Sequence, residues 1–174
     1  NLNSGALSDS RIELIYADGL EYLKNSLSLY DIIIFDLPDP REESLSKLYS
    51  LEGYRLAVNR LKKNGAIVTQ ATSPYFAPNA FWCIGKTIQE AGLNLTSYHV
   101  NIPSFGEWGF HIGHRNSFAV TDIELPAGLK YIDEEIWNAM RVFPKDMKNR
   151  PVKVNRLDHP RLAHYYRQDW NLLF

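Results

Sequence analysis

One stretch, residues 30–40, constrains the fold of this chain more than any other. It contains an apolar run rich in β-branched residues, 31–35, followed by the sequence Asp36-Leu37-Pro38-Asp39-Pro40. A short apolar run bounded by turn residues is typical of a buried strand in a parallel sheet. Because proline lacks an N–H and restricts the residue before it, we expect this strand to end at the turn.

The two carboxylates of this turn are candidate functional groups. In open α/β sheets, ligands bind beyond the carboxyl ends of the strands, which is where Asp36 and Asp39 are expected to lie. The structural alternative is a simple turn or helix cap, since aspartate is common in both. The turn by itself leaves both interpretations open.

Composition limits the classes of protein that fit. A length of 174 residues predicts one domain, and an apolar content of 45% is ample for a packed core. The net charge is −1 and the isoelectric point is near 6.6, so no nucleic-acid partner is expected. No membrane span or signal peptide is visible. The single Cys83 excludes an internal disulfide and a multi-cysteine zinc site, and it fits a reducing compartment.

The order of the expected elements specifies an α/β fold. Strands are predicted over 11–16, 31–35 and 66–71. They alternate with helices over 20–27, over 45–61 (ended by Gly65) and over 79–91, where Asn79 is the expected cap. This alternation predicts a parallel sheet with covering helices. Residues 95–102 and 109–112 flank a turn at 103–107 and predict an antiparallel hairpin at the sheet edge. Further helix starts are expected near Asp133 and Asp158.

Several stretches together resemble the spermidine synthase (polyamine aminopropyltransferase) family. The resemblance covers about residues 11–116. It rests on the strand and turn at 30–40, Ala17-Asp18-Gly19, Leu48-Tyr49-Ser50 with Gly53-Tyr54, the strand ending at Gln70, and residues 102–106 with Gly109-Phe110. The Asp-Leu-Pro-Asp-Pro form, residues 70–75 and the tail at 154–157 look most like a bacterial subgroup. Members of that subgroup often carry an N-terminal membrane region.

The resemblance implies a fold and a location. It implies a partial Rossmann-like, class I methyltransferase-like sheet, mostly parallel, with an antiparallel hairpin at the edge and a helical C-terminal tail. Residues 1–120 would form the C-terminal part of the catalytic domain, and 121–174 a helical extension packed on it. The implied location is cytoplasmic, either as such or as the cytoplasmic domain of a membrane protein.

The implied activity is aminopropyl transfer from decarboxylated S-adenosylmethionine, a cosubstrate, to a diamine such as putrescine. No permanently bound cofactor is implied. The diamine nitrogen is an ammonium with a reference pKa of about 10, by analogy with lysine, and must lose a proton before it attacks. Asp39 matches the family's proton acceptor and Asp36 its neighbouring amine-site carboxylate. The sulfonium leaves as a neutral thioether, so no general acid is required.

Other residues match the two substrate sites. Asp18 and Gly19 match the adenosyl side, and Gln70, Phe105 and Trp108 the amine side. Each has a structural alternative: Asp18 as a helix cap, Gln70 as a partner of backbone groups at a strand end, and the two aromatics as core residues. No metal is expected, because His99, His111 and His114 lack a convincing ligand set.

The chain also departs from the family. The Gly-rich turn and the ribose-binding acid are missing, Phe105 replaces a common tyrosine, and Arg41-Glu42 replaces Gly-Pro. We therefore expect the fragment alone to be inactive and to require a missing N-terminal part, which the resemblance to the subgroup would place in a membrane. We expect a homo-oligomer, or pairing of the exposed strand edge with the chain's own tail. A methyltransferase and a non-catalytic polyamine-binding domain of a membrane protein are the alternatives.

Overall fold

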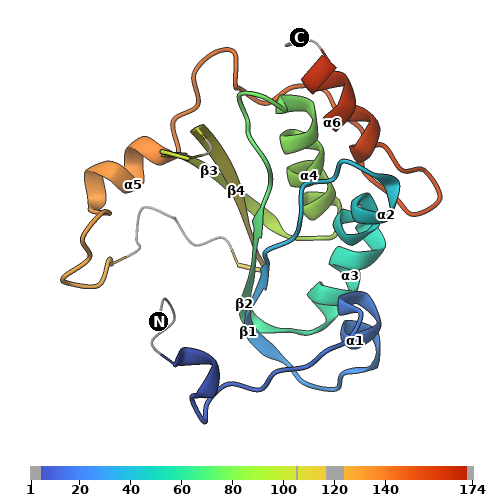
Figure 1. Cartoon of the computed structure of the whole chain (residues 1–174), viewed down its shortest axis with the longest axis vertical. Helices are drawn as coiled ribbons and strands as arrows, with labels where there is room; N and C mark the ends of the chain where they lie inside the picture. The colour runs from blue at the N-terminus through green and yellow to red at the C-terminus, as the bar shows by residue number, and fades with distance from the viewer. Residues whose placement is uncertain (1–4, 105, 117–123, 172–174) are drawn as a thin grey trace.

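A four-stranded mixed sheet forms the centre of the molecule (Figure 1). The computed structural model describes residues 5–104, 106–116 and 124–171. The strands lie in the order β1-β2-β4-β3, where β1 is Tyr30–Phe35, β2 Leu61–Gln70, β3 Asn94–Ile102 and β4 Gly106–His114. Only β1 and β2 pair in parallel, and the other two pairings are antiparallel. The predicted α/β class is confirmed. The expectation of a mostly parallel sheet is wrong for the described strands, because the hairpin supplies half of them.

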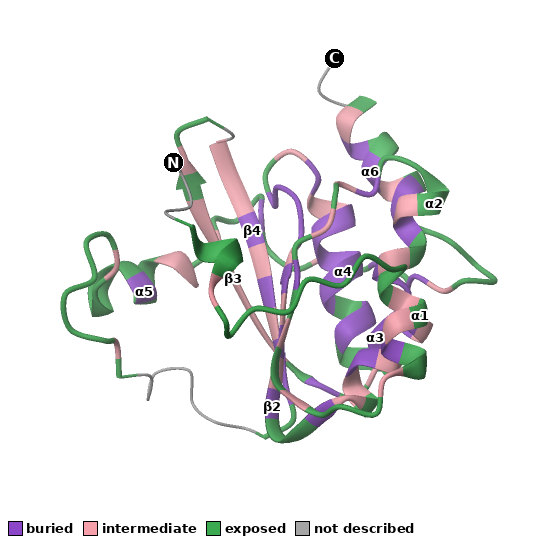
Figure 2. Ribbon diagram, turned by 60° about the horizontal axis from the view of Figure 1, so that its bottom comes forward, coloured by how far each residue is buried: buried purple, intermediate pink, exposed green. Residues whose placement is uncertain are grey.

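Most helices cover one face of this sheet. Figures 1 and 2 show α1 to α4 and α6 on that face, while α5 lies apart from them beside β3. Their bounds are η1 Ala6–Ser8, α1 Gly19–Asn25, α2 Glu43–Ser46, η2 Lys47–Tyr49, α3 Leu51–Asn59, α4 Pro78–Glu90, α5 Glu134–Met140 and α6 Leu162–Asn171. In the part of the chain that the structure describes, no helix is long and apolar enough to cross a membrane.

The core lies between the sheet and α4, the most deeply buried helix (Figure 2). Phe81, Ile84 and Ile88 of α4 are fully buried and belong to one apolar cluster with Ile67 of β2. The ring of Phe81 lies directly over Gly109 of β4, where an added Cβ would come within 2.3 Å of a ring carbon. The sheet and α4 can approach this closely because position 109 has no side chain.

β1 is half-buried, which corrects the prediction of a fully buried strand. Ile33 and Phe35 pack toward the core, whereas Ile32 and Ile34 are 60% and 70% exposed. Successive side chains of a strand point to opposite faces, and at β1 the described helices cover only the face of Ile33 and Phe35. The outer face of β1 therefore presents apolar side chains to solvent.

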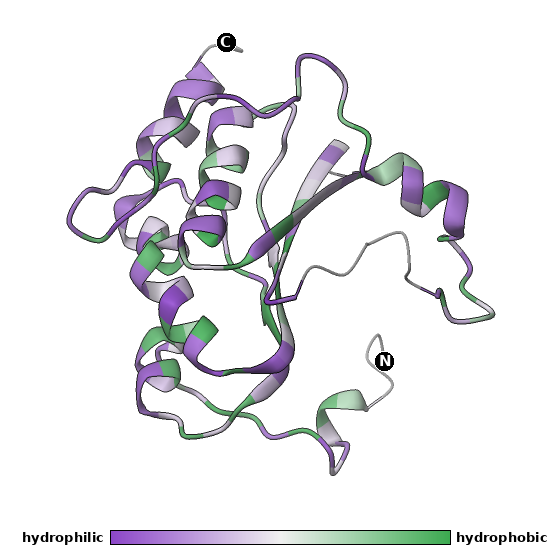
Figure 3. Cartoon of the chain, turned by 180° about the vertical axis from the view of Figure 1, so that it is seen from behind, coloured by the Kyte–Doolittle hydropathy of each residue, from purple (hydrophilic) through white to green (hydrophobic). Residues whose placement is uncertain are grey.

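The strand predicted over residues 11–16 is absent. Apolar and polar residues follow one another along this segment (Figure 3), but it is extended, unpaired and exposed, with Tyr16 at 94%. A strand needs a neighbour for its backbone groups, and no described strand lies beside this segment. In the described part of the C-terminal tail, no residue pairs with the free edge of β1 either, since α5 contacts β3 and α6 packs on α4.

Helix ends also differ from expectation. The helix predicted over 45–61 is three short elements, since Ser50 is extended and caps α3 by accepting from the N–H of Gly53 at 3.1 Å. Gly65 lies inside β2 and ends no helix. The helix predicted from Asn79 is α4, but Asn79 is not its cap: the carboxylate of Asp169 in α6 accepts from the N–H groups of Asn79 and Ala80, at 2.8 and 3.1 Å.

Candidate functional site

A cleft of about 860 Å³ opens where β1 and β2 end. Four of the predicted site residues line it together: Asp36, Asp39, Gln70 and Trp108. Its other walls are formed by Leu37, Pro38, Arg41, Leu45, Ile102, Ser104, Phe110 and Trp170. The structure thus gathers these four residues around one cleft: Asp36 and Asp39 follow β1, Gln70 ends β2, and Trp108 lies near the start of β4. Phe105, the fifth predicted residue of this side, lies outside the described residues.

Asp39 has two unlike carboxylate oxygens. Its Oδ2 accepts a hydrogen bond from the Tyr166 hydroxyl of α6 at 2.9 Å. Its Oδ1 is buried and has no hydrogen-bond partner among the described residues. A buried unpartnered carboxylate oxygen is costly, so its presence at a cleft indicates a place for an external donor.

The turn that carries Asp39 is held by Gln70 and Tyr49. The Tyr49 hydroxyl lies 3.1 Å from the carbonyl oxygens of Leu37 and Pro38, and the Gln70 Nε2 donates to the Leu37 carbonyl at 2.6 Å. Gln70 Nε2 also lies 3.3 Å from the Tyr49 hydroxyl. These contacts fix the backbone between the two aspartates to the end of β2.

The other end of the Gln70 amide is also occupied. Its Oε1 accepts from the Trp108 Nε1 and from the backbone N–H of Thr72, both at 3.0 Å. Thr72 has a φ of 61°, which is unusual for a β-branched residue, so this contact supports a strained turn. Because both donors and both acceptor positions of the amide are used, Gln70 acts here as the strand-end partner that its structural alternative describes.

The tyrosines around Asp39 remain protonated donors. Burial and the charge of Asp39 raise the pKa of Tyr166 to about 12. Burial, followed by the charge of Asp39, raises the pKa of Tyr49 well above its ordinary value. Ionising either phenol beside the carboxylate would place two anions together, so both hydroxyls keep their protons near neutral pH.

A second groove of about 450 Å³ lies between α1 and β1. Gly19, Leu20 and Tyr22 line its helix side, and Ile32 to Phe35 its strand side. Asp36 and Leu37 line this groove and the cleft alike. The two spaces therefore share a wall at the end of β1.

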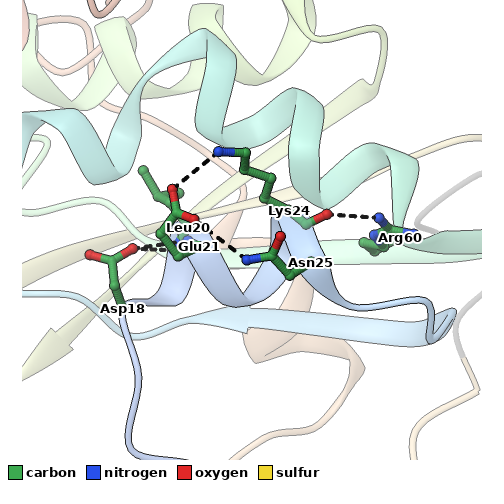
Figure 4. Close-up of polar contacts among 6 residues, drawn as sticks. All are labelled: Asp18, Leu20, Glu21, Lys24, Asn25 and Arg60. Carbon is green, nitrogen blue, oxygen red and sulfur yellow. Dashed lines mark hydrogen bonds and ion pairs between the residues drawn. The ribbon is translucent and has the colours of Figure 1, made fainter.

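Asp18 takes the helix-cap position that its structural alternative predicts (Figure 4). Its Oδ1 accepts from the N–H groups of Leu20 and Glu21 at 2.9 and 3.0 Å. The other end of α1 is held by Arg60, whose guanidinium donates to the carbonyls of Leu23 and Lys24 at 2.9 and 3.2 Å. These contacts fix α1, and with it Gly19, beside the groove.

The histidines that suggested a metal have ordinary structural partners. His111 is fully buried, with Nε2 at 2.8 Å from the Phe81 carbonyl and Nδ1 at 2.9 Å from the Ser97 hydroxyl. Burial lowers the pKa of His111 to about 4. His99 contacts a Glu107 carboxylate oxygen at 2.7 Å. In residues 5–104, 106–116 and 124–171, no group of three or more potential ligands is placed to hold a metal.

Sequence reasoning missed the contribution of the C-terminal helix. Tyr166 and Trp170 of α6 both reach the site, although 127 positions separate Tyr166 from Asp39. Their spacing along the chain is typical of an amphipathic helix that packs on a core, and it carries no indication of a site. Only the three-dimensional arrangement brings them to the turn.

Comparisons with known proteins identify the family. The spermine/spermidine synthase domain matches residues 1–121. A polyamine aminopropyltransferase of Oceanobacillus iheyensis is 38% identical over 97% of this chain and 34% of its own length. One of Leptospira interrogans is 35% identical over 98% of this chain and 34% of its own length. The chain thus spans about a third of the length of these relatives.

Solved structures agree at the level of the fold. A spermidine synthase in complex with the transition-state analogue AdoDATO has a TM-score of 0.72 at 19% identity, covering 98% of this chain and 55% of that one. The spermidine synthase of Thermotoga maritima has a TM-score of 0.65 at 19% identity, over 84% and 53%. With the domain match over most of the chain, these comparisons show that the protein belongs to the spermine/spermidine synthase domain family.

Proposed function

We propose that this chain supplies the amine side of an aminopropyl transfer from decarboxylated S-adenosylmethionine to a diamine such as putrescine. The observation that carries the proposal is Asp39, whose buried Oδ1 faces no partner in the described residues while Asp36 lines the same cleft. Two carboxylates in one cleft suit a dicationic amine, because each can hold one N–H-bearing group. The cleft volume of about 860 Å³ leaves room for the methylene chain.

The proposed step balances with Asp39 as proton acceptor. The diamine nitrogen gives a proton to the free Oδ1 of Asp39 and attacks the aminopropyl carbon beside the sulfonium. The new N–C bond forms as the C–S bond breaks, and the electron pair of the C–S bond stays on sulfur. Methylthioadenosine leaves as a neutral thioether, and Asp39 returns its proton to solvent.

The neighbouring residues take supporting roles in this proposal. Asp36 holds an ammonium at the mouth of the cleft, and Trp108 forms an apolar wall for the methylene chain. Gln70 positions the turn and Trp108 through its four contacts rather than binding the amine. Phe105 stays a prediction for the amine side.

The adenosyl cosubstrate fits the groove between α1 and β1 in this proposal. Because the two spaces share the wall at Asp36, a sulfonium in this groove would lie beside an amine in the cleft. Gly19 lines this groove, and Asp18 has a second carboxylate oxygen beyond the one that caps α1. We place the adenine amino group at that oxygen.

We further propose that the active protein is longer than this chain. The relatives are about three times its length, and the α1–β1 groove is bordered by exposed apolar residues of β1. Additional residues would complete the adenosyl site, and we expect the chain alone to be inactive. An N-terminal membrane region, homo-oligomerisation and the division into 1–120 and 121–174 remain predictions. A methyltransferase would have no use for two carboxylates in the cleft, so we do not propose one.

The test is turnover by the full-length protein with Asp39→Asn. Methylthioadenosine release with putrescine should fall by about 100- to 10,000-fold, since the amide cannot accept the proton. Asp31→Asn is the matched control, because Asp31 is an exposed aspartate of β1 that pairs with Lys62. Near-normal turnover by folded Asp39→Asn would exclude this role. Amine binding without turnover by the wild type would instead identify a non-catalytic polyamine-binding protein.

A further inference from the structure

We infer that Tyr166 of the C-terminal helix is a positioning residue for Asp39, holding Oδ2 so that Oδ1 alone is left for the amine. This inference rests on the proposed function of Asp39. Tyr166 lies beyond residues 1–121, the part that the family domain matches. The site would thus depend on a segment outside that domain.

The contact itself is short, partly buried and specific. The Tyr166 hydroxyl donates to Oδ2 of Asp39 at 2.9 Å, and the Tyr166 side chain is only 5% exposed. A hydrogen bond to a carboxylate is stronger than one between neutral groups, and it fixes the rotation of the carboxyl plane. With Oδ2 engaged, the oxygen without a partner is Oδ1.

The helix that carries Tyr166 is anchored near both of its ends. Near its N-terminus, the Asn155 carboxamide oxygen accepts from the N–H groups of Arg161 and Leu162 at 3.0 and 3.2 Å, while its nitrogen donates to the Ser46 carbonyl at 2.8 Å. Near its C-terminus, Asp169 caps α4. Tyr166 therefore cannot shift along the axis of α6 without breaking the contacts at one end of that helix.

The charges around Asp39 keep Tyr166 as the donor and Asp39 as the acceptor of this hydrogen bond. The charged or titratable groups that line the cleft beside Asp39 or interact with it are Asp36, Arg41, Tyr49 and Tyr166. The raised pKa of Tyr166, about 12, keeps its proton available across the range in which an amine transferase works. Asp39 is consequently the acceptor of this bond.

The experiment compares Tyr166→Phe with Tyr165→Phe in the full-length protein. Both variants lose one phenol of α6, but the Tyr165 hydroxyl contacts the backbone N–H of Lys153 at 3.2 Å, not Asp39. For Tyr166→Phe we expect kcat to fall about tenfold, with the KM for putrescine changing less than about twofold. Tyr165→Phe should change neither of these.

A second readout does not depend on activity. The carbon-13 resonance of the Asp39 carboxyl group, assigned with Asp39→Asn, reports the hydrogen bond to that group in active and inactive protein alike. At one fixed pH, the resonance should shift in Tyr166→Phe and stay unchanged in Tyr165→Phe. An unchanged resonance in Tyr166→Phe would overturn the inference, whereas a wild type that releases no methylthioadenosine overturns the proposed function alone. If Tyr166→Phe does not fold, Tyr166→Met, which also lacks a donor, takes its place in the same comparison.

Discussion

Asp36 and Asp39 occupy different surroundings although only three positions separate them. Asp36 is exposed at the end of β1, whereas Asp39 is half-buried and bound by Tyr166. A carboxylate in water attracts an ammonium from solution, while a partly desolvated one with a free oxygen is better placed to take a proton. This difference supports giving the two residues separate roles in the proposed reaction.

Arg41 is a cation in the wall of a cleft proposed to bind a dication. Like charges in one cleft repel, so Arg41→Gln should tighten putrescine binding by about threefold at low salt. Titration calorimetry on the full-length protein would measure this. The gain should shrink in 0.5 M salt, since exposed charges are screened.

Arg55→Gln is the control for this charge change. Arg55 is an exposed arginine of α3 that does not belong to the cleft wall described above. Its substitution should leave putrescine affinity unchanged. Equal effects of the two substitutions, or none, would show that Arg41 does not act on the amine.

Individual site residues could be predicted where strand order alone determines their position. Asp36, Asp39 and Gln70 end neighbouring strands, so the topology brings them together. Tyr166 could not be found this way, because its place at Asp39 depends on how α6 packs on α4. The roles of Gln70 and Asp18 also needed coordinates, since their polar atoms can serve the backbone or a ligand equally well.

Among the elements, existence was predicted better than boundaries. The periodic segments at 31–35, 66–71 and 79–91 form β1, β2 and α4. The cap of α4 was mispredicted because Asp169, from a helix 90 positions later, occupies the site where Asn79 was expected to act. The segment 11–16 has the residue pattern of a strand but no neighbouring strand. The pattern indicates that the segment could pair, and it does not show that a partner is present.

The packing of α4 on β4 makes stability depend on pH through His111. Its folded-state pKa of about 4 lies below the ordinary 6.5, so the native state resists protonation while the unfolded chain accepts it. Stability is therefore fully present above pH 6.5 and is lost as the pH falls toward 4, by roughly 3 kcal/mol over that interval. Urea unfolding of the protein at a series of pH values measures this slope.

His111→Gln should remove most of that slope, because an amide keeps hydrogen-bonding ability without titrating. The control is His159→Gln. His159 is exposed, and its side chain lies beside the carboxylate of Asp158. That control should retain the wild-type dependence. A His111→Gln variant that loses stability between pH 6.5 and 4 as steeply as the wild type would refute the assignment.

The molecule as a whole is covered unevenly: most helices pack on one face of the sheet, α5 packs on the other face at β3, and that other face is open at β1. Helices cover the sheet face of Ile33 and Phe35, but Ile32 and Ile34 on the other face are largely exposed. β1 pairs only with β2 in the described structure, so the backbone groups of its outer edge also lack a strand partner. Exposed apolar residues beside an unpaired edge are characteristic of a surface that another segment covers.

This open side leads to a prediction about ligand binding. The groove between α1 and β1 includes Ile32 and Ile34 in its wall, so the proposed adenosyl site is bordered by that same open surface. We expect the 174-residue chain alone to bind methylthioadenosine at least tenfold more weakly than a protein of the relatives' full length. The reason is that a nucleoside in this class of fold lies across the ends of several strands, of which β1 is only one. Titration calorimetry on both proteins provides the comparison, and Asp36→Asn in the longer protein serves as a control that alters the shared wall without opening the groove. Equal, low-micromolar binding by the short chain would show that α1, β1 and the turn at Asp36 form a complete nucleoside site by themselves.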